Sequence, residues 1–206
     1  GDAPSAAQLQ SIPDPFVRGL AELGRLRTYP KNTVFITEGD SSDSVFVILS
    51  GKVKVFISDT EGHEMILDTQ GAGEYVGEMA LDGKPRSASV MTLEPTTFSV
   101  VGRDPVREAI RRNPDFALDM ISRIIDRARI ATNSVKDLAL LDVYGRVARL
   151  LLNMSVETAD GPLQIPEKIT QQEIAERVGA SRDMVSRIFR ALTAGGYIKV
   201  GNRIVT

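Results

Sequence analysis

The spacing of apolar residues changes near Arg103, and this change limits the possible folds more than any other feature of the chain. Before it, from about residue 27 to 102, short runs of β-branched and aromatic residues alternate with turn-forming glycine, aspartate and serine. Many short strands at even spacing are typical of a small β-barrel or jelly roll. The runs predicted to be strands are Val34–Ile36, Val45–Leu49, Val53–Ile57, Glu64–Leu67, Ser89–Met91 and Thr97–Val101.

After Arg103 the spacing becomes helical. Asp104 is a candidate cap for a short helix that ends near Arg112, and Asn113-Pro114 restarts a longer helix. On the longer helix, mainly apolar residues recur at alternating spacings of 3 and 4, which is a heptad pattern. Such a stripe forms either a domain core or the seam of a helix–helix dimer, and the charges on the other faces favour a homodimer seam. The seam residues would be Leu118, Ile121, Ile125, Ala128, Thr132, Val135 and Ala139.

Composition argues against most enzymes. The chain has no cysteine and a single histidine, His63, so it lacks thiolate ligands and the usual Ser-His-Asp triad. We expect His63 to be an ordinary polar residue at a strand turn, and we predict no catalytic residue, no metal and no cofactor. No apolar stretch approaches the roughly 20 residues of a membrane span, and no leader-like segment opens the sequence. We therefore expect a cytoplasmic protein without a membrane partner.

Charge is distributed unevenly along the chain. Residues 1–141 hold 16 Lys and Arg against 20 Asp and Glu, a net charge of −4, whereas residues 142–206 hold 9 against 7, a net charge of +2. Four arginines of the second segment lie between residues 177 and 190. Only this segment could present a basic surface to the phosphates of nucleic acid.

The second segment contains a helix-turn-helix pattern. We expect helix from Asp142 onward, a loop through residues 159–162, and then a capping box at Thr170–Glu173. Gly179 supplies the left-handed residue of the turn, and Ser181 caps the next helix. The inward faces would carry Ile174, Ala175 and Val178 on the first helix, and Val185, Ile188, Phe189 and Leu192 on the second.

The outward face of the second helix favours DNA binding over a plain helical hairpin, the alternative. Arginine at the front of a recognition helix can bridge guanine O6 and N7. Residues 198–205 predict a hairpin with the two-residue turn Gly201-Asn202, placed where a winged variant has its wing. The predicted DNA-binding residues are Thr170, Gln171, Ser181, Arg182, Asp183, Ser186 and Arg187, and Arg190 lies on the same face.

Residues 73–88 interrupt the strand pattern with groups that suit a nucleotide. Gly77 lets a backbone N–H approach an anion, and Glu78 can accept from a ribose hydroxyl. Arg86 can neutralise a phosphodiester, and Ser87 adds a neutral donor. Without its context, the segment would be a loop with a surface salt bridge.

The full strings are more specific. Gly77-Glu78-Met79-Ala80-Leu81 followed by Pro85-Arg86-Ser87-Ala88 resembles the phosphate-binding cassette of cyclic-nucleotide-binding domains. Together with the heptad helix, Leu138–Val143 with Gly145-Arg146, and Ile169–Ile174, it resembles the cAMP receptor protein/fumarate-nitrate regulator family over about residues 20–206.

The resemblance implies an α+β protein in three parts. Residues 1–113 would form a β-roll (a double-stranded β-helix or jelly-roll barrel) that binds a cyclic nucleotide and carries an N-terminal helix. Residues 114–141 would form the dimerisation helix, and residues 142–206 a winged helix-turn-helix domain. The implied ligand-binding residues are Leu67, Gly77, Glu78, Met79, Arg86, Ser87, Arg127, Thr132 and Asn133.

The implied function is transcription regulation by a homodimer on a palindromic double-stranded DNA operator. The implied effector is a cyclic nucleotide, cAMP first and cGMP as a further candidate, and RNA polymerase is a further candidate partner. A regulator with another effector, a constitutive regulator and a cyclic-nucleotide module of a signalling assembly that does not bind DNA stay as alternatives.

Three departures from the family pattern limit what the resemblance implies about the base of the nucleotide, the DNA site and the polymerase contact. Family members that bind cAMP use a Thr-Ser or Thr-Asn pair on the dimer helix, where this chain has Ala131-Thr132 or, one residue along, Thr132-Asn133. Asp183 stands where these members carry glutamate. The loop at residues 156–163 is shorter than the loop with which they touch RNA polymerase.

Overall fold

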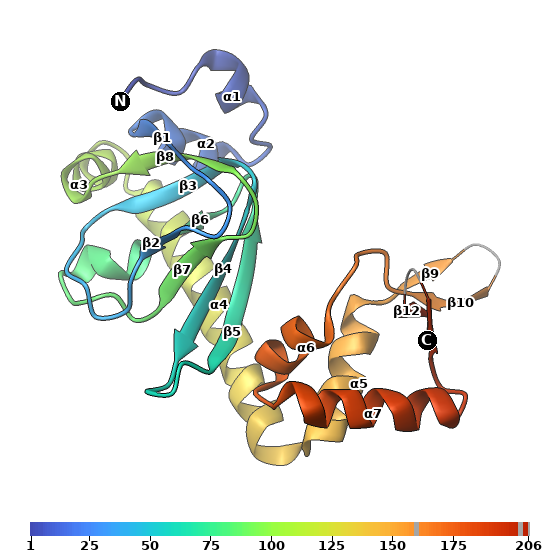
Figure 1. The fold of residues 1–206 in the computed structure, drawn as a ribbon. Coiled ribbons are helices and arrows are strands. Elements are labelled where there is room, and N and C mark those ends of the chain that lie inside the picture. The colour runs from blue at the N-terminus through green and yellow to red at the C-terminus, as the bar shows by residue number, and fades with distance from the viewer. Residues whose placement is uncertain (159–160, 202–203, 206) are drawn as a thin grey trace. The chain divides into compact units, whose positions relative to one another are not determined.

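The computed structural model describes residues 1–158, 161–201 and 204–205 (Figure 1). The chain divides into two compact units, residues 1–57 with 66–128 and residues 58–65 with 129–206.

The first unit is built on two four-stranded antiparallel sheets, with strand orders β1-β8-β3-β6 and β2-β7-β4-β5. This arrangement confirms the predicted jelly-roll class, and all six predicted strands are present. The strands are β1 (Arg25–Tyr29), β2 (Val34–Ile36), β3 (Val45–Ser50), β4 (Lys52–Ser58), β5 (Glu64–Gly71), β6 (Tyr75–Val76), β7 (Ser89–Thr92) and β8 (Thr96–Val101).

Strand β3 contains the continuous apolar run Val45–Leu49, and its place in the first unit explains why both of its faces are apolar. Successive side chains of a strand point to opposite faces of its sheet. Phe46 and Ile48 pack inside the roll with residues of both sheets, such as Val90 and Phe98. Val45, Val47 and Leu49 pack on the other face, against the helices. Both faces of β3 are therefore buried.

Four helices belong wholly or mainly to the first unit: α1 (Ala6–Gln10), α2 (Pro15–Glu22), α3 (Arg103–Arg112) and the first half of α4 (Asp115–Leu140). They bury Val17 and Leu20 from α2, Val106 from α3 and Met120 from α4 in one cluster with β3. This cluster fixes the helices to the sheet that leads into the cassette, because β6 lies at its edge.

Three local features of the first unit go beyond the sequence-based expectations or differ from them. Helix α1, whose bounds were not predicted, begins at Ala6 with a capping box from Ser5. Gly102, not Asp104, caps α3, and Asp104 lies in its first turn. Strand β1 was not predicted because it is an edge strand whose charged side chains are mostly exposed, so it lacks the apolar alternation of a buried strand.

The second unit holds a helical core and a four-stranded sheet of order β11-β12-β10-β9. Its core contains all seven residues predicted to face inward in the helix-turn-helix. The elements are α5 (Val143–Met154), β9 (Val156–Thr158), β10 (Gly161–Gln164), α6 (Gln171–Val178), α7 (Arg182–Ala194), β11 (Lys199–Val200) and β12 (Ile204–Val205).

One connection in this unit differs from expectation. The segment expected to be a loop at 156–163 forms the antiparallel pair β9 and β10, and residues 159–160 lie outside the described part. The terminal hairpin pairs Val200 with Ile204. Asn202 of the predicted two-residue turn and the residue that follows it lie outside the described part.

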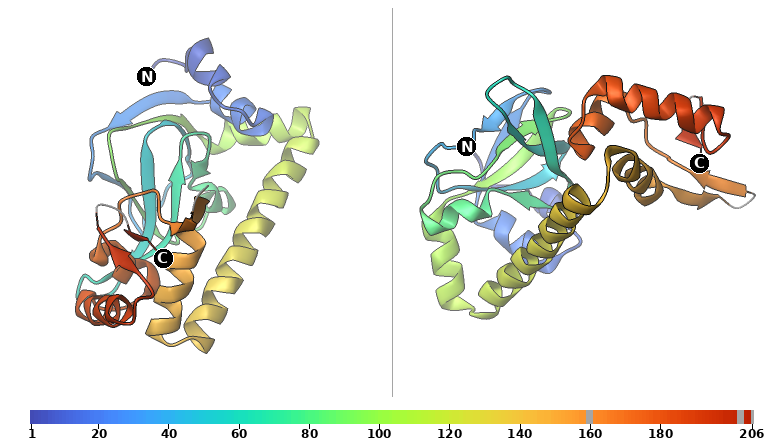
Figure 2. Two further views of the ribbon diagram at one scale, coloured as in Figure 1. Left: turned by 90° about the vertical axis from the view of Figure 1, so that its right-hand side faces the viewer. Right: turned by 90° about the horizontal axis from the view of Figure 1, so that it is seen from below.

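Helix α4 is continuous over 26 residues (Figure 2). One face carries Phe116, Met120, Arg123 and Arg127, which are buried or partly buried. The predicted seam residues from Leu118 to Val135 are all exposed in the single chain. At about 100° per residue, the two faces are centred roughly 135° apart. Among the residues described, no helix is long and apolar enough to cross a membrane.

Candidate functional site

The cassette begins where β6 ends at Val76. Gly77 follows with a φ of +90°, a conformation that favours glycine. A Cβ atom on Gly77 would come within 2.7 Å of Arg86 Nη1 and 3.0 Å of the Ser44 carbonyl oxygen. Glycine is therefore required both by the backbone angle and by the close approach of these groups. A short 3-10 helix, η1 (Glu78–Asp82), comes directly after it.

Arg86 is only 5% exposed and holds the start of the cassette. Its Nη1 donates to the Gly77 carbonyl oxygen at 2.6 Å, and its Nη2 donates to Ser42 Oγ and to the Ser44 carbonyl oxygen, each at 2.7 Å. Its Nε is buried without a hydrogen-bond partner among the described residues. The acceptors that Arg86 uses are thus all neutral oxygen atoms.

Glu78, also buried, forms an ion pair with Arg127 of α4. Arg127 Nη2 donates to the Tyr75 carbonyl oxygen at 2.5 Å, and its guanidinium lies 4.8 Å from the centre of the Tyr75 ring. These contacts join two segments that are far apart in sequence: the segment from β6 to the first residue of η1, which holds Tyr75 and Glu78, and the middle of α4, which holds Arg127.

The two arginines differ in their electrostatic surroundings. Burial lowers the pKa of Arg86 below its ordinary value, although the charges of Glu78 and Asp43 act in the opposite direction. Burial also acts to lower the pKa of Arg127, but the charge and hydrogen bond of Glu78 outweigh it and the pKa is raised. Arg127 therefore has its counter-ion within the protein, whereas Arg86 is a buried cation without a directly bonded anion.

The remaining predicted ligand residues are more exposed. Ser87 Oγ lies 3.4 Å from Met79 Sδ, and both side chains are exposed, as is that of Leu67 on β5. Thr132 and Asn133 are exposed on α4, beyond the boundary of the first unit at Ala128. The structure therefore brings Gly77, Glu78, Arg86 and Arg127 together within one unit.

Sequence reasoning missed Tyr75, Ser42 and Ser44 as parts of this site. Tyr75 lies two residues before Gly77, so its place next to the cassette could have indicated that it takes part in the site. Ser42 and Ser44 carried none, because they contact Arg86 across 44 and 42 residues of sequence.

The helix-turn-helix is formed as its sequence predicts. The Thr170 hydroxyl accepts from Glu173 N–H at 3.1 Å, and Glu173 Oε2 accepts from Thr170 N–H at 2.7 Å. Gly179 has a φ of +64°, and Ser181 Oγ accepts from Met184 N–H at 3.2 Å. Arg146 fixes the end of α6, since its Nε donates to the Val178 carbonyl oxygen at 2.8 Å.

Helix α7 presents polar side chains away from this core. Arg182, Asp183, Arg187 and Arg190 are exposed, and Ser186 is partly exposed. Thr170 and Ser181 cap the two helices and are also exposed, whereas Gln171 is partly buried. Exposed arginines along one helix face can contact both base edges and phosphates.

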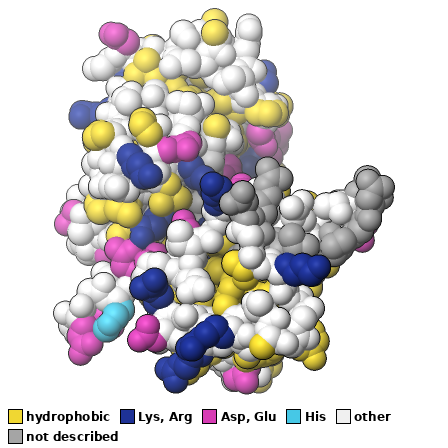
Figure 3. All heavy atoms as spheres, turned by 45° about the vertical axis from the view of Figure 1, so that its right-hand side comes forward, with side chains coloured by type: hydrophobic (Ala, Val, Ile, Leu, Met, Phe, Trp, Pro, Cys, Tyr) yellow, Lys and Arg dark blue, Asp and Glu magenta, His cyan; other side chains and the backbone are white. Residues whose placement is uncertain are grey.

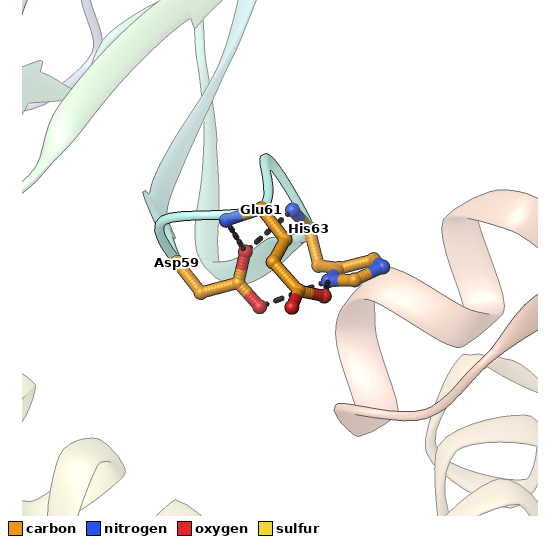
Figure 4. A network of polar contacts seen from close by, with 3 residues as sticks. All are labelled: Asp59, Glu61 and His63. Atoms are coloured by element: carbon orange, nitrogen blue, oxygen red, sulfur yellow. Dashed lines mark hydrogen bonds and ion pairs between the residues drawn. The ribbon is translucent and has the colours of Figure 1, made fainter.

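The single histidine lies at the turn between β4 and β5, at the surface beside acidic side chains (Figures 3 and 4). Asp59 Oδ1 accepts from the backbone N–H groups of Glu61 and His63, and Asp59 Oδ2 lies 2.9 Å from His63 Nδ1. The hydrogen bond with Asp59 raises the pKa of His63, and the same bond lowers the pKa of Asp59. These contacts organise a turn, as expected of His63.

Two family models match the chain, one in each half. A cyclic nucleotide-binding domain matches residues 26–113, and a Crp-like helix-turn-helix domain matches residues 145–206. The first match contains the whole cassette, and the second contains α6 and α7.

Curated relatives extend over nearly the whole chain. The cAMP-activated global transcriptional regulator CRP of Salmonella typhimurium is 34% identical over 198 residues, which are 93% of this chain and 93% of that protein. The cAMP-activated global transcriptional regulator Vfr of Pseudomonas aeruginosa is 36% identical over 190 residues, which are 88% of this chain and 87% of that protein.

Solved structures agree on the fold. The catabolite activator protein of Thermus thermophilus is 30% identical, with a TM-score of 0.55 and coverage of 97% of this chain and 93% of that chain. The c-di-GMP responsive global regulator CLP of Xanthomonas campestris has a TM-score of 0.79 over 98% of both chains at 24% identity, a level that supports the fold alone.

Along this chain, the first family match covers most of the β-roll with its cassette, and the second covers the helix-turn-helix that follows the long helix. The curated relatives and the solved structures are similar over nearly the whole of this length. The chain belongs to the cAMP receptor protein/fumarate-nitrate regulator (CRP/FNR) family of transcription regulators.

Proposed function

We propose that this protein is a homodimeric transcription regulator whose effector is a cyclic mononucleotide, with cAMP as the first candidate. In this proposal the nucleotide binds at the cassette, the dimer forms along α4, and α7 contacts the bases of a palindromic operator. The relatives described as cAMP-activated support cAMP, at 34% and 36% identity.

The environment of Arg86 carries the proposal. A guanidinium that is 95% buried costs free energy unless an anion or several acceptors compensate it. Three neutral oxygen atoms accept from Arg86, and its Nε–H remains unpaired within the described residues. A phosphodiester at this position would supply the missing negative charge. Arg127 does not need one, because Glu78 already neutralises it.

Glu78 suits the ribose in this proposal. Its carboxylate is held in place by Arg127 and can accept from a ribose hydroxyl while it keeps that ion pair. The ligand would then contact a residue whose partner lies on α4, so binding would favour one arrangement of this helix over another. An effector changes DNA affinity only if it binds the two arrangements with different affinities.

The effector is tested by calorimetric titration of the intact protein with cAMP, cGMP and c-di-GMP. The last is included because the Xanthomonas campestris regulator is described as c-di-GMP responsive. We expect cAMP to bind, and Arg86→Ala to weaken binding at least about tenfold through the loss of charge-assisted hydrogen bonds. Arg107→Ala, which removes an exposed arginine of α3, is the control.

Binding of cGMP in preference to cAMP would change the effector within the proposal. Binding of c-di-GMP in preference to both would contradict a mononucleotide effector, but it would leave the proposed regulator of transcription. No binding of any of the three to the wild-type protein would refute the cyclic-nucleotide proposal. Thr132→Ala and Asn133→Ala then distinguish the two registers in which the base contact can form on α4, because only the residue that meets the base should change the preference between cAMP and cGMP.

DNA binding is tested separately with Arg182→Ala and Arg187→Ala on a selected operator. A bidentate arginine–guanine contact contributes about 1–3 kcal/mol, so each change should weaken specific binding by a factor of about 5 to 150. Arg25→Ala, on exposed β1, is the control. If both α7 variants bind the operator as tightly as the control, the recognition surface lies elsewhere.

A further inference from the structure

An arginine outside the cassette holds the far end of its 3-10 helix. Arg103 is the first residue of α3, and its side chain donates twice to one oxygen atom, the Leu81 carbonyl. The distances are 3.0 Å from Nε and 2.8 Å from Nη2. Leu81 is the fourth of the five residues of η1, so this bond fixes the end of the turn whose first residue is Glu78.

The chain passes close to this guanidinium immediately after η1. Gly83 has a φ of +84°, and a Cβ atom on it would lie 2.7 Å from Arg103 Nη2. The glycine therefore leaves room for the Arg103 side chain to reach Leu81, and it adopts a backbone angle that other residues rarely adopt.

Both ends of η1 are consequently tied to the helices that follow the roll. Glu78 pairs with Arg127 on α4, and the Leu81 carbonyl accepts from Arg103 on α3. The Leu81 side chain adds apolar contact, since it packs against the cluster that contains Val106 of α3 and Met120 of α4. A five-residue 3-10 helix has few hydrogen bonds of its own and needs such outside contacts to keep one conformation.

We propose that Arg103 is a positioning residue of the nucleotide site. It keeps η1 in the conformation that presents Glu78 and the cassette backbone to the ligand, and it contacts no ligand itself. This inference rests on the proposed function, because it assigns Arg103 to the same site. A turn that is ordered before binding loses less conformational entropy when the ligand arrives, so the loss of Arg103 weakens binding without removing a ligand contact.

The experiment compares Arg103→Ala, Arg103→Lys and Arg107→Ala in the full-length protein. Arg107 lies one turn further along α3 and is exposed, so its variant controls for the loss of one positive charge from this helix. Affinity is measured by calorimetry with cAMP, or with whichever cyclic nucleotide the wild-type protein binds. Hydrogen exchange of the peptide that covers residues 77–84 is measured without ligand. Thermal unfolding reports the stability of each variant.

We expect Arg103→Ala to weaken binding about tenfold and to speed exchange of the cassette amides, because a charge-assisted pair of hydrogen bonds is lost. Arg103→Lys should recover part of both effects, since lysine can donate once to the same carbonyl, and Arg107→Ala should change neither. In a Glu78→Ala background, Arg103→Ala should reduce nucleotide affinity by a smaller factor than in the wild type, because the side chain that Arg103 positions is absent.

Equal affinity of Arg103→Ala and Arg107→Ala would overturn the inference while leaving the proposed function intact. The inference would also be overturned if Arg103→Ala reduced nucleotide affinity by the same factor with and without Glu78, since Arg103 would then act independently of that side chain. If Arg103→Ala fails to fold, Arg103→Lys is compared with Arg107→Ala instead, by nucleotide affinity and by hydrogen exchange of residues 77–84. Absence of nucleotide binding in the wild-type protein would overturn the proposed function, and the role of Arg103 with it.

Discussion

Tyr75 combines two roles at the entrance to the cassette. Its carbonyl oxygen accepts from Arg127, and its ring packs beside the Arg127 guanidinium and the Phe16 ring. Its hydroxyl group is buried without a hydrogen-bond partner in the described part of the chain. Burial raises the pKa of Tyr75 to about 12, although the charge of Arg127 acts to lower it. Ring packing, rather than the hydroxyl, therefore accounts for the contribution of this side chain.

Stability above pH 10 should depend on Tyr75. The pKa of the Tyr75 hydroxyl is higher in the folded protein than in the unfolded chain, so folding favours its neutral form. The free energy of unfolding is therefore unaffected by this group below the unfolded pKa near 10, and it falls as the pH rises toward 12. We expect the wild-type protein to lose about 2 kcal/mol more than Tyr75→Phe between about pH 9 and about pH 11.5. Urea unfolding of both proteins across this range measures the difference.

At neutral pH, Tyr75→Phe should be as stable as the wild type or more stable by about 1 kcal/mol, since it removes an unsatisfied polar group. If the free energies of unfolding of the two proteins changed in parallel with pH, the prediction would be wrong, and the Tyr75 hydroxyl would have contact with water or a hydrogen-bond partner.

At the scale of elements, the two helices of the DNA-reading motif are defined by their ends. Helix α6 begins with a capping box at Thr170, and α7 begins with a cap at Ser181. The two helices are joined by a short turn in which Gly179 has a left-handed backbone conformation. Gly19 offers a contrast, because it lies inside α2 and a Cβ atom there would meet no other atom within 4 Å. The same substitution at these two glycines should therefore have opposite effects.

Gly179→Ala should destabilise the second unit by about 1 kcal/mol or more, since an L-residue with a side chain is strained at a φ of +64°. Gly179→Asn should cost less, because asparagine tolerates this region. Gly19→Ala should stabilise the first unit by about 0.5–1 kcal/mol through its higher helix propensity. Calorimetric unfolding of the three variants checks these signs, and a stabilising Gly179→Ala would contradict the turn geometry.

At the scale of the whole molecule, the exposed face of α4 requires explanation. Large apolar side chains on it, among them Leu118, Ile121, Ile125 and Val135, are 46–64% exposed in the single chain. They share the heptad spacing that a parallel pair of helices uses. The same face is centred about 135° around the helix from the residues with which α4 packs on the roll, so a second copy can cover it without displacing those residues.

Ile125→Glu should convert the proposed dimer to a monomer, because a two-fold seam would bring two carboxylates together in an apolar contact. Ile130→Glu is the matched control, since Ile130 is 56% exposed on the same helix but lies about 170° from the centre of the seam. Sedimentation velocity distinguishes the two outcomes. Equal mass of wild type and Ile125→Glu at the same concentration would contradict a dimer along α4.

Much of this molecule follows from local chemistry. Several features depend only on residues that are close together in the sequence. They are the predicted strands, the change to helical spacing after Arg103, the caps at Thr170 and Ser181 and the left-handed conformation of Gly179. The buried faces of α6 and α7 follow from the helical repeat. For this reason the jelly roll and the helix-turn-helix could be predicted from sequence.

The contacts that build the candidate site depend on tertiary structure. Arg86 meets Ser42 across 44 residues, Arg103 meets Leu81 across 22, and Arg127 meets Glu78 from a different helix. Nothing in the local sequence distinguishes Arg103 from exposed Arg107, or Ser42 from its neighbours. Periodicity indicates which face of an element is buried, but only the packing of distant elements decides which groups that face will meet.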